Sequence, residues 1–493
     1  MYNFLKNRHH KRDGGTLMEQ QLTSNIEENI KNLNDTLLID KSFDLIYRII
    51  HIGDKKACLY MIDGFTNDDL LEKILQFLLG VKPDEVPNDA HSFSKNILPY
   101  GQVSLENNTD TLIHLILTGL VVFIVDGYDE GIVLDIREYP ARSVEEPEKD
   151  RTLRGSRDGF VETIVWNTAL IRRRIRSPKL INEMLHAGRN SYTDIVLCYL
   201  DNRVDKDLLN RIRNKIKEVQ VDALTMNQES LAECLFPHKW INPFPKFKYT
   251  ERPDTAAACI LEGNIVILVD NSPAAMVLPS SIFDIIEEAD DYYFPPVTGT
   301  YLRFTRFVTF IFALFLTPFF LMLMQNPNIV PNWLAFISVK DPVNLPFLWQ
   351  FLILEFAIDG LKLASLNTPN MLTTPLSLIA ALVVGDFSVS SGWFNAEVML
   401  YMAFVVLATY TQSSMELGYA LKFMRLFVLI LTGIFNIWGF FFGVAFVLVS
   451  LIFNKTIAEK SYLYPLFPFS FENVMARFFR IRIPHSYKKT RKK

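Results

Sequence analysis

The pattern of hydrophobic and polar positions divides the chain into two parts of different character. Of its 50 basic and 54 acidic residues, only 12 lie between Arg303 and Phe453, whereas the residues before that stretch have the mixed polarity of a water-exposed protein. Charged side chains are costly in hydrocarbon, so membrane helices carry few of them. The pattern therefore predicts a soluble N-terminal half of about 300 residues followed by an all-α bundle of transmembrane helices.

One stretch of the N-terminal half recurs 144 residues later. Leu117–Asp126 (LTGLVVFIVD) and Leu261–Asp270 (LEGNIVILVD) are rich in β-branched residues, end in aspartate and a turn, and are each followed by a second apolar run. Each pattern predicts a β-hairpin. Helical periodicity predicts amphipathic helices over Asp68–Gly80 and Asp205–Val221, and Ile195–Leu200 predicts a buried strand. We therefore expect an α/β half made of two tandem, mixed α/β sub-domains.

The apolar runs after Arg303 indicate the membrane topology. Phe307–Met324 and Val398–Met415 are uncharged runs of 18 residues, and Leu426–Phe453 is an uncharged run of 28. As a helix, the last run is about 42 Å long, which is more than one span and less than two, so a short hairpin is one interpretation. Leu345–Gly392 is apolar but interrupted at Thr368–Asn370 and at Pro375, which predicts a helix, a break, and another span or a re-entrant pair.

These patterns predict five regions along the chain. They are a disordered basic start over 1–20, α/β sub-domains over 21–140 and 141–298, a transmembrane domain over 299–455 with four to six membrane segments, and a basic tail over 456–493. No apolar signal-peptide segment follows the start. Basic residues favour the cytoplasmic ends of spans. The pairs Arg303/Arg306 and Lys422/Arg425 and the eight basic residues after Asn473 therefore predict a cytoplasmic N-terminal half and tail.

Three ionisable residues stand out within the membrane half. Glu355, Asp359 and Lys362 are spaced i, i+4 and i+7 in an otherwise apolar segment, so a helix places them on one face. Ionisable groups at membrane depth normally face a cavity or one another. One hypothesis is a polar stripe that lines an ion pathway. The alternatives are an interfacial helix with self-paired charges and a buried ion pair between helices that only fixes packing.

A second charged region, residues 142–180, is rich in arginine. It contains the candidate contact residues Glu145, Glu146, Arg154, Arg157, Arg172, Arg173, Arg174 and Arg176. Arginine binds phosphate, acidic lipid headgroups or the carboxylates of a partner. The alternatives are pairing with the preceding glutamates, for which arginine geometry is suited, and plain exposure to water.

Other kinds of chemistry find little support. The four cysteines are far apart, which does not suit structural zinc. The sequence has no nucleotide-binding, hydrolase, metalloprotease or kinase motif. The net charge of −4 gives no reason for nucleic-acid binding. We therefore expect no enzyme activity, no cofactor and no metal.

Several sequence blocks occur in a distinctive order. They are Glu145–Glu148 (EEPE), Arg154–Phe160 (RGSRDGF), Asn167–Leu180 (NTALIRRRIRSPKL), Tyr249–Asp254 (YTERPD) and Asp290–Tyr293 (DDYY), the last just before the first expected span. Together they resemble the A subunit of the GerA-type spore germination receptors of endospore-forming bacteria. The resemblance runs from Lys41 to the C-terminus.

The resemblance also includes the polar stripe of the membrane half. The family's E…E..REAG.R.P segment is similar to the stretch that contains Glu355, Asp359, Lys362 and Pro369. Two glutamates of the family are replaced in this stretch, one by Asp359 and the other by Leu363. Within the YTERPD block, the resemblance marks Glu251, Arg252 and Asp254 as candidates for contacts between subunits or domains.

The resemblance implies a specific function. Such A subunits assemble with a transporter-like B subunit and a lipoprotein C subunit in the inner membrane of the dormant spore, among membrane lipids. The complex senses nutrients such as amino acids, sugars or nucleosides and triggers germination, and the B subunit is the favoured nutrient binder. The A subunit is expected to self-associate into a homo-oligomer that forms a nutrient-gated ion-release pore. The alternative is a non-conducting scaffold that relays a signal from the nutrient-binding partner.

Overall fold

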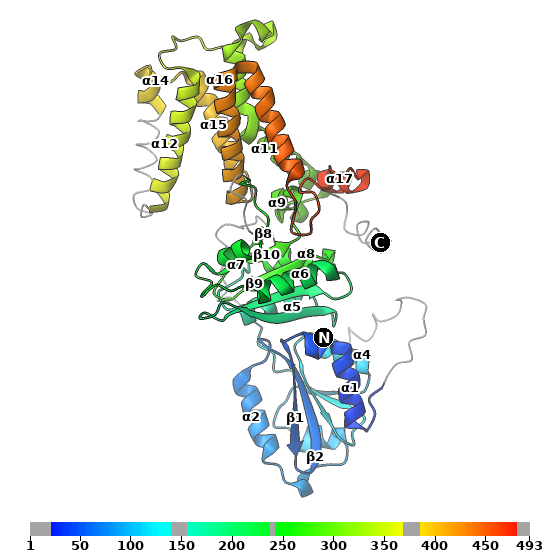
Figure 1. The fold of residues 1–493 in the computed structure, drawn as a ribbon. Helices are drawn as coiled ribbons and strands as arrows, with labels where there is room; N and C mark the ends of the chain where they lie inside the picture. The colour runs from blue at the N-terminus through cyan, green and yellow to red at the C-terminus, as the bar shows by residue number, and fades with distance from the viewer. Residues whose placement is uncertain (1–20, 140–154, 237–241, 368–384, 481–493) are drawn as a thin grey trace. The chain divides into compact units, whose positions relative to one another are not determined.

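The computed structural model describes residues 21–139, 155–236, 242–367 and 385–480. The last strand ends at Leu278 and the longest helices follow it, so an α/β part precedes a helical part (Figure 1). The chain divides into two compact units, one over residues 1–146, 158–228 and 251–275, the other over 147–157, 229–250 and 276–493. The predicted fold class is confirmed.

The first sheet is antiparallel and has five strands in the order β1-β2-β4-β5-β3. Its strands are β1 (Leu45–Ile52), β2 (Lys55–Ile62), β3 (Val103–Glu106), β4 (Val121–Val125) and β5 (Gly131–Leu134). Its helices are α1 (Ile26–Leu37), α2 (Asp68–Leu79), α3 (Ala90–Asn96) and α4 (Thr109–Leu117). The helix predicted over Asp68–Gly80 and the hairpin predicted after Leu117 are present as α2 and β4–β5.

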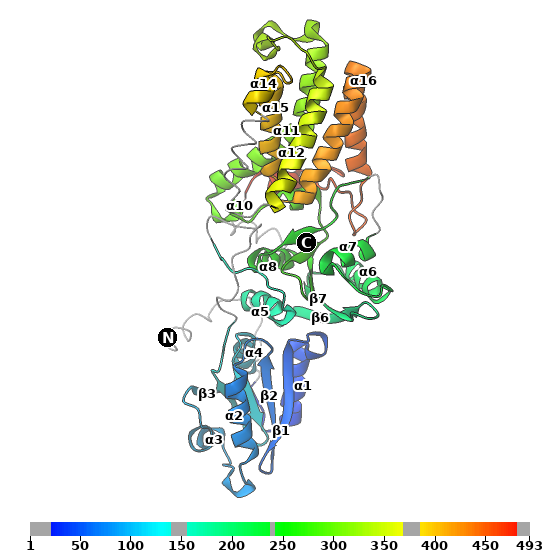
Figure 2. The same cartoon turned by 90° about the vertical axis from the view of Figure 1, so that its left-hand side faces the viewer.

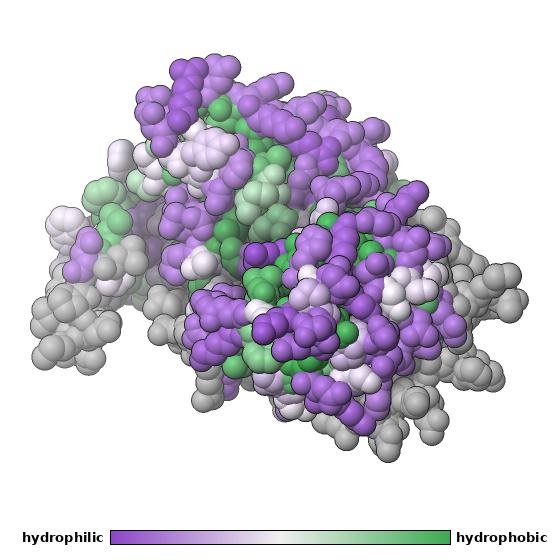
Figure 3. Space-filling model, turned by 90° about the horizontal axis from the view of Figure 1, so that it is seen from below, coloured by the Kyte–Doolittle hydropathy of each residue, from purple (hydrophilic) through white to green (hydrophobic). Residues whose placement is uncertain are grey.

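Alternation along the strands gives this sheet two apolar faces. Cys58 and Tyr60 of β2 pack with Leu33 in the core that α1 and α4 cover. The neighbouring residues Ala57 and Leu59 face the core that α2 and α3 cover. Because side chains alternate across a strand, helices on both sides of one sheet require apolar residues at consecutive positions. Hydrophilic side chains cover most of the outer face of the α/β part that Figure 3 looks onto.

The second sheet repeats the strand order of the first, as β6-β7-β9-β10-β8. Its strands are β6 (Leu180–Ala187), β7 (Thr193–Leu200), β8 (Lys248–Thr250), β9 (Ile265–Val269) and β10 (Ala275–Leu278). The helices are α5 (Ile164–Arg174), α6 (Lys206–Lys217), α7 (Asn227–Leu235) and α8 (Pro253–Glu262). The strands β4 and β9, which come from the recurring stretches, hold the same place in the two sheets, so the tandem sub-domains predicted from that recurrence are confirmed.

Two polar contacts repeat with the strands. Asp126 after β4 and Asp270 after β9 each accept a hydrogen bond from the first backbone N–H of α1 and α5, at 3.4 and 3.3 Å. Buried Asn29 in α1 and Asn167 in α5 each bond both the N–H and the C=O of a residue six positions earlier. These aspartates therefore fix the start of a helix as well as ending a strand.

The helical part is built around α11. Its elements are α9 (Ile282–Ile286), α10 (Asp290–Tyr293), α11 (Pro296–Gln325), α12 (Phe347–Asn367), α14 (Ser388–Ser390), α15 (Ala396–Tyr410), α16 (Met415–Phe453) and α17 (Phe471–Phe478). Figure 2 shows α11 among α12, α15 and α16. Ala313 and Leu314 of α11 pack with Leu421 of α16, and Phe320 of α11 packs with Phe351 of α12. In the described chain, α11 and α16 are long and apolar enough to cross a membrane.

Helix α16 folds back on itself. Asn436 has φ 56° and ψ −135°, which no helix tolerates, and the chain continues as a second helical limb after it. Gly439 lies against the carbonyl oxygen of Leu431 with no room for a Cβ, and Gly443 lies against Val428. The two limbs, Met415–Phe435 and Ile437–Phe453, are therefore antiparallel, as the hairpin interpretation requires. The predicted break at Thr368–Asn370 and Pro375 lies outside the described residues.

Candidate functional site

The acidic side chains of α12 meet basic side chains from the first limb of α16. Arg425 Nε donates to Glu355 Oε1 at 2.7 Å, and Lys422 Nζ lies 3.3 Å from Glu355 Oε2. Lys422 also forms an ion pair with Asp359. Glu355, Lys422 and Arg425 are buried, whereas the Asp359 side chain is 34% exposed. We call these four residues the α12–α16 charge cluster.

The third residue of the stripe has different partners. The Lys362 ammonium lies 5.0 Å from the ring centre of Tyr410 in α15 and 5.7 Å from that of Tyr419 in α16. Both distances suit cation–π contacts. The stripe is therefore divided, with its carboxylates held by basic groups and its lysine placed over aromatic rings.

Lys422 and Arg425 have a role that their sequence pattern does not predict. A basic cluster beside an apolar run predicts the cytoplasmic end of a span, but both residues are buried against α12. The sequence does hold one signal for this pairing. Lys422 and Arg425 are three positions apart and precede 28 uncharged residues, and their spacing is similar to that of the carboxylates Glu355 and Asp359, which are four positions apart. Burying Glu355, Lys422 and Arg425 is tolerable because each acid of the cluster lies beside a base.

Arg172 connects the two sub-domains of the α/β part. Its Nε donates to Asp44 Oδ2 at 2.7 Å, and a terminal nitrogen donates to Asp44 Oδ1 at 2.9 Å and to Ser42 Oγ at 3.0 Å. Asn182 Nδ2 donates to Asp44 Oδ2 at 3.0 Å. All four side chains are at least 99% buried. We call this group the Arg172 latch; because its pairing is bidentate, it fixes orientation as well as contact.

The other arginines of the block are bound separately. The Arg173 guanidinium lies 4.8 Å from the ring centre of Tyr139, and Arg174 donates to Asp158 Oδ1 at 2.7 Å. Two arginines of α5 therefore form ion pairs, Arg172 with Asp44 and Arg174 with Asp158. Arg157 and Arg176 are exposed, and Glu145, Glu146 and Arg154 lie outside the described residues.

The YTERPD block is largely internal. Buried Arg252 pairs with Asp254 at 2.6 Å. The backbone oxygen of Glu251 accepts a hydrogen bond from Phe160 N at 2.8 Å, which joins this block to the RGSRDGF block. These contacts position α8, whose first residue is Pro253.

A groove of about 520 Å³ opens beside the Arg172 latch. Two ion pairs border the groove. Arg213 Nε lies 2.6 Å from Glu183 Oε1, and Lys206 Nζ lies 2.6 Å from Asp201 Oδ1. These charged side chains of the rim are therefore paired with one another. Among the described residues, no three His, Cys, Asp or Glu side chains gather to hold a metal ion.

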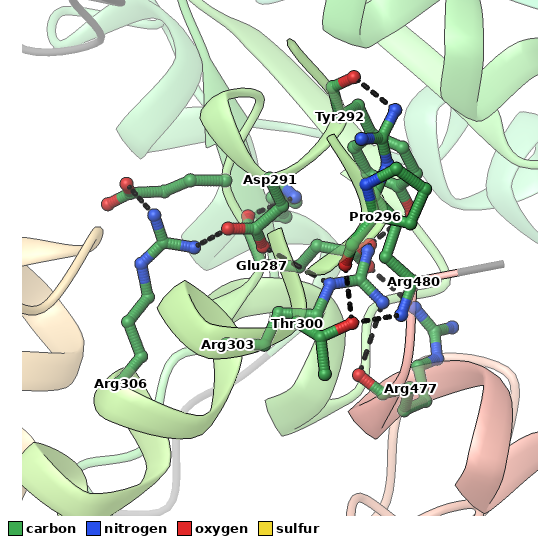
Figure 4. Close-up of polar contacts among 11 residues, drawn as sticks. Glu287, Asp291, Tyr292, Pro296, Thr300, Arg303, Arg306, Arg477 and Arg480 are labelled. Atoms are coloured by element: carbon green, nitrogen blue, oxygen red, sulfur yellow. Dashed lines mark hydrogen bonds and ion pairs between the residues drawn. The ribbon is translucent and has the colours of Figure 1, made fainter. Parts of the chain in front are cut away.

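A second charged cluster lies at the base of α11 (Figure 4). Glu287 accepts from Arg303 of α11 and, at 2.9 Å, from Arg477 of α17. Arg306 donates to both Asp291 and Glu288 at 2.6 Å. By sequence, Arg303 and Arg306 predict only the cytoplasmic end of the first span. The structure shows that they tie the linker of α9 and α10 to α11 and to the C-terminal segment.

The two main carboxyl groups of this cluster differ in acidity. Burial works against the charged form of Glu287, but Arg477, Arg303 and Lys248 outweigh it and hold the pKa of Glu287 below its ordinary value. At Asp291 burial dominates, and the arginines only partly oppose the rise in its pKa. Glu287 is therefore the firmer anchor of the cluster.

Comparison with known proteins points to one family. A family model described as "Bacillus/Clostridium GerA spore germination protein" matches residues 31–493. The chain is 34% identical to stage V sporulation protein AF of Bacillus subtilis (strain 168) over 430 residues, which cover 87% of each chain. It is 25% identical to spore germination protein KA of the same organism over 475 residues, covering 94% of this chain and 85% of that one.

A solved structure is also similar in sequence. The N-terminal domain of the A subunit of the Bacillus megaterium spore germinant receptor GerK3 is 26% identical and covers 53% of this chain and 98% of its own, with a TM-score of 0.42. The family model spans nearly the whole chain, and the resemblance to germination-receptor A subunits is confirmed. The chain belongs to the Bacillus/Clostridium GerA family of spore germination proteins.

Proposed function

We propose that this chain is a germinant-receptor A subunit of the spore inner membrane that responds to nutrients by opening an ion pathway. Its partners are a transporter-like B subunit, a lipoprotein C subunit and further copies of itself. The N-terminal half and the tail are cytoplasmic. The support is family membership together with two helices that can cross a membrane.

The α12–α16 charge cluster carries the proposal. Four ionisable residues sit together in a bundle whose other buried residues are mostly apolar. Ionisable groups in such a setting are expensive to keep and mark pathways for ions in many membrane proteins. In the paired arrangement each carboxylate is neutralised by Lys422 or Arg425, so it does not attract a cation. We assign this arrangement to the closed state, and opening separates the pairs.

The chain order offers a route for the signal. The strand β10 leads directly through α9 and α10 into α11, and Arg425 also donates to the backbone oxygen of Ala313 in α11. A movement of α11 therefore changes the surroundings of the pair between Arg425 and Glu355. The cluster at Glu287 ties the start of this route together.

The test uses spores that contain Asp359→Asn at normal protein levels. Losing one charge-assisted hydrogen bond costs about 1.5–3 kcal/mol, which shifts a closed–open equilibrium by roughly one to two orders of magnitude. Monovalent cations should therefore leave these spores at lower nutrient concentrations than they leave the wild type. The matched control is Asp341→Asn, because Asp341 is an exposed residue outside the cluster.

The scaffold alternative gives a different result. If Asp359→Asn and the combination Glu355→Gln with Asp359→Asn both leave nutrient-triggered cation release unchanged, the membrane half only anchors the α/β part. Since one relative is a stage V sporulation protein, the cation content of the dormant spores is measured first. This separates a defect in spore formation from a defect in germination.

A further inference from the structure

The segment around α17 turns apolar side chains outward. Phe471, Met475 and Phe479 follow one another at intervals of four residues and are 66, 38 and 50% exposed. The turn before the helix adds Phe467 and Phe469, at 55 and 68%. A short surface helix normally directs such a stripe into the core. A continuous exposed apolar surface of this kind indicates a binding partner.

Other side chains of this segment already contact the rest of the helical part. The Phe478 ring lies 4.5 Å from the Phe307 ring of α11 and 6.2 Å from that of Phe283. Arg477, the preceding residue, forms ion pairs with Asp284 and Glu287. The outward stripe therefore follows from how α17 is attached, and rotating the helix to bury it would break these contacts.

The attachment point lies at a defined level of α11. Arg480 N donates to Thr300 Oγ1 at 3.2 Å, and Phe478 packs on Phe307. The last charge of α11 is at Arg306, and the helix is uncharged from Phe307 to Gln325. If α11 crosses the membrane, this change from charged to apolar marks the boundary between headgroups and acyl chains, where aromatic side chains are enriched.

Charge selects the kind of partner. Residues 481–493, directly after this segment, contain six Lys and Arg and no Asp or Glu. Six like charges on each chain oppose the approach of a second copy through this surface, whereas anionic headgroups attract them. We propose that residues 466–479 form a membrane-interface anchor whose outward apolar side chains enter a bilayer rich in anionic phospholipid. The proposal rests on α11 spanning that bilayer.

The test measures the depth of α17 in the full chain. A fluorescent non-natural amino acid replaces Met475, and the protein is placed in bilayers whose acyl chains carry bromine as a quencher, with and without phosphatidylglycerol. Phe312, which is 44% exposed in the uncharged run of α11, is the position for the positive control. Tyr192, which is 67% exposed in the α/β part, is the position for the negative control.

The anchor predicts that bromine quenches position 475 nearly as strongly as position 312, and position 192 hardly at all. Phe471→Ser with Phe479→Ser should reduce the quenching at 475, and omitting phosphatidylglycerol should reduce it too. Quenching at 312 but not at 475 overturns the anchor and leaves the proposed function standing. Absence of quenching at 312 overturns both. Emission from 475 that changes with protein dilution rather than with bromine overturns the anchor in favour of a second copy.

Discussion

Arg172 and Arg173 are neighbours in sequence with opposite environments. The sequence marks the arginines of α5 as one block, but only Arg172 is fully buried, and its partner Asp44 is 128 residues away. Spacing along a chain shows which side chains share a helix face, and it cannot show which distant strand packs there. The importance of the block was therefore predictable, and the identity of the buried pair was not.

Replacing Arg172 should be much more costly than replacing Arg173. Arg172→Met leaves the Asp44 carboxylate buried without a counter-charge, which costs about 3–5 kcal/mol. Arg173→Met removes an exposed cation–π contact with Tyr139, worth about 0.5–1 kcal/mol. Denaturant unfolding of the detergent-solubilised full chain, followed through the α/β part, measures both losses. Equal losses would contradict the assignment of the latch to Arg172.

The carboxyl groups at the base of α11 should respond to pH in opposite ways. The lowered pKa of Glu287 means that its ionised form stabilises the fold near neutral pH, and this contribution is lost as pH falls through the lowered value. The pKa of Asp291 is raised, so the folded state takes up its proton more readily and gains stability on acidification.

Glu287→Gln should therefore lower the thermal unfolding midpoint at neutral pH and flatten its fall towards acidic pH. Asp291→Asn should have the smaller effect at neutral pH, because the folded state of the wild type already resists ionisation there. Unfolding midpoints of the solubilised full chain at several pH values test this pair. If Asp291→Asn lowered the unfolding midpoint at neutral pH more than Glu287→Gln does, Glu287 would not be the stronger of the two anchors.

At the scale of elements, the fold-back of α16 shows how far apolar length can be interpreted. A run of 28 uncharged residues was too long for one span, and its glycines and Asn436 allowed a break or close packing. The structure uses both, with Asn436 at the turn and Gly439 and Gly443 at the contact between limbs. Length alone could not locate the turn, because several residues in the run can leave the helix.

The turn should depend on the residue at position 436. Glycine adopts positive φ freely, whereas a β-branched side chain is strained there. Asn436→Gly should keep the limbs paired, and Asn436→Val should weaken the pairing by about 1–2 kcal/mol. Cysteines at Phe427 and Phe446, whose ring centres are 4.6 Å apart, report the pairing by disulfide formation. Equal cross-linking in both variants would count against the fold-back at this position.

At the scale of the whole molecule, local patterns predicted the architecture well. The recurrence of Leu117–Asp126 in Leu261–Asp270 predicted two related sub-domains, and the structure shows that their sheets share one strand order. The charge-poor sequence after Arg303 predicted the helical part. The acidic stripe of α12 was also visible, but its partners lie 63 and 70 residues away in α16. Patterns within one element cannot reveal such pairs, and the gating proposal depends on them.

Exchanging the charges of Asp359 and Lys422 tests the gating claim most directly. In spores with normal protein levels, Asp359→Lys places two ammonium groups together and should release monovalent cations without nutrient. Adding Lys422→Asp restores an opposite pair and should restore both cation retention in dormancy and release on nutrient addition. If Asp359→Lys spores retain and release cations as the wild type does, or if the double exchange restores nothing, these pairs do not hold an ion pathway closed.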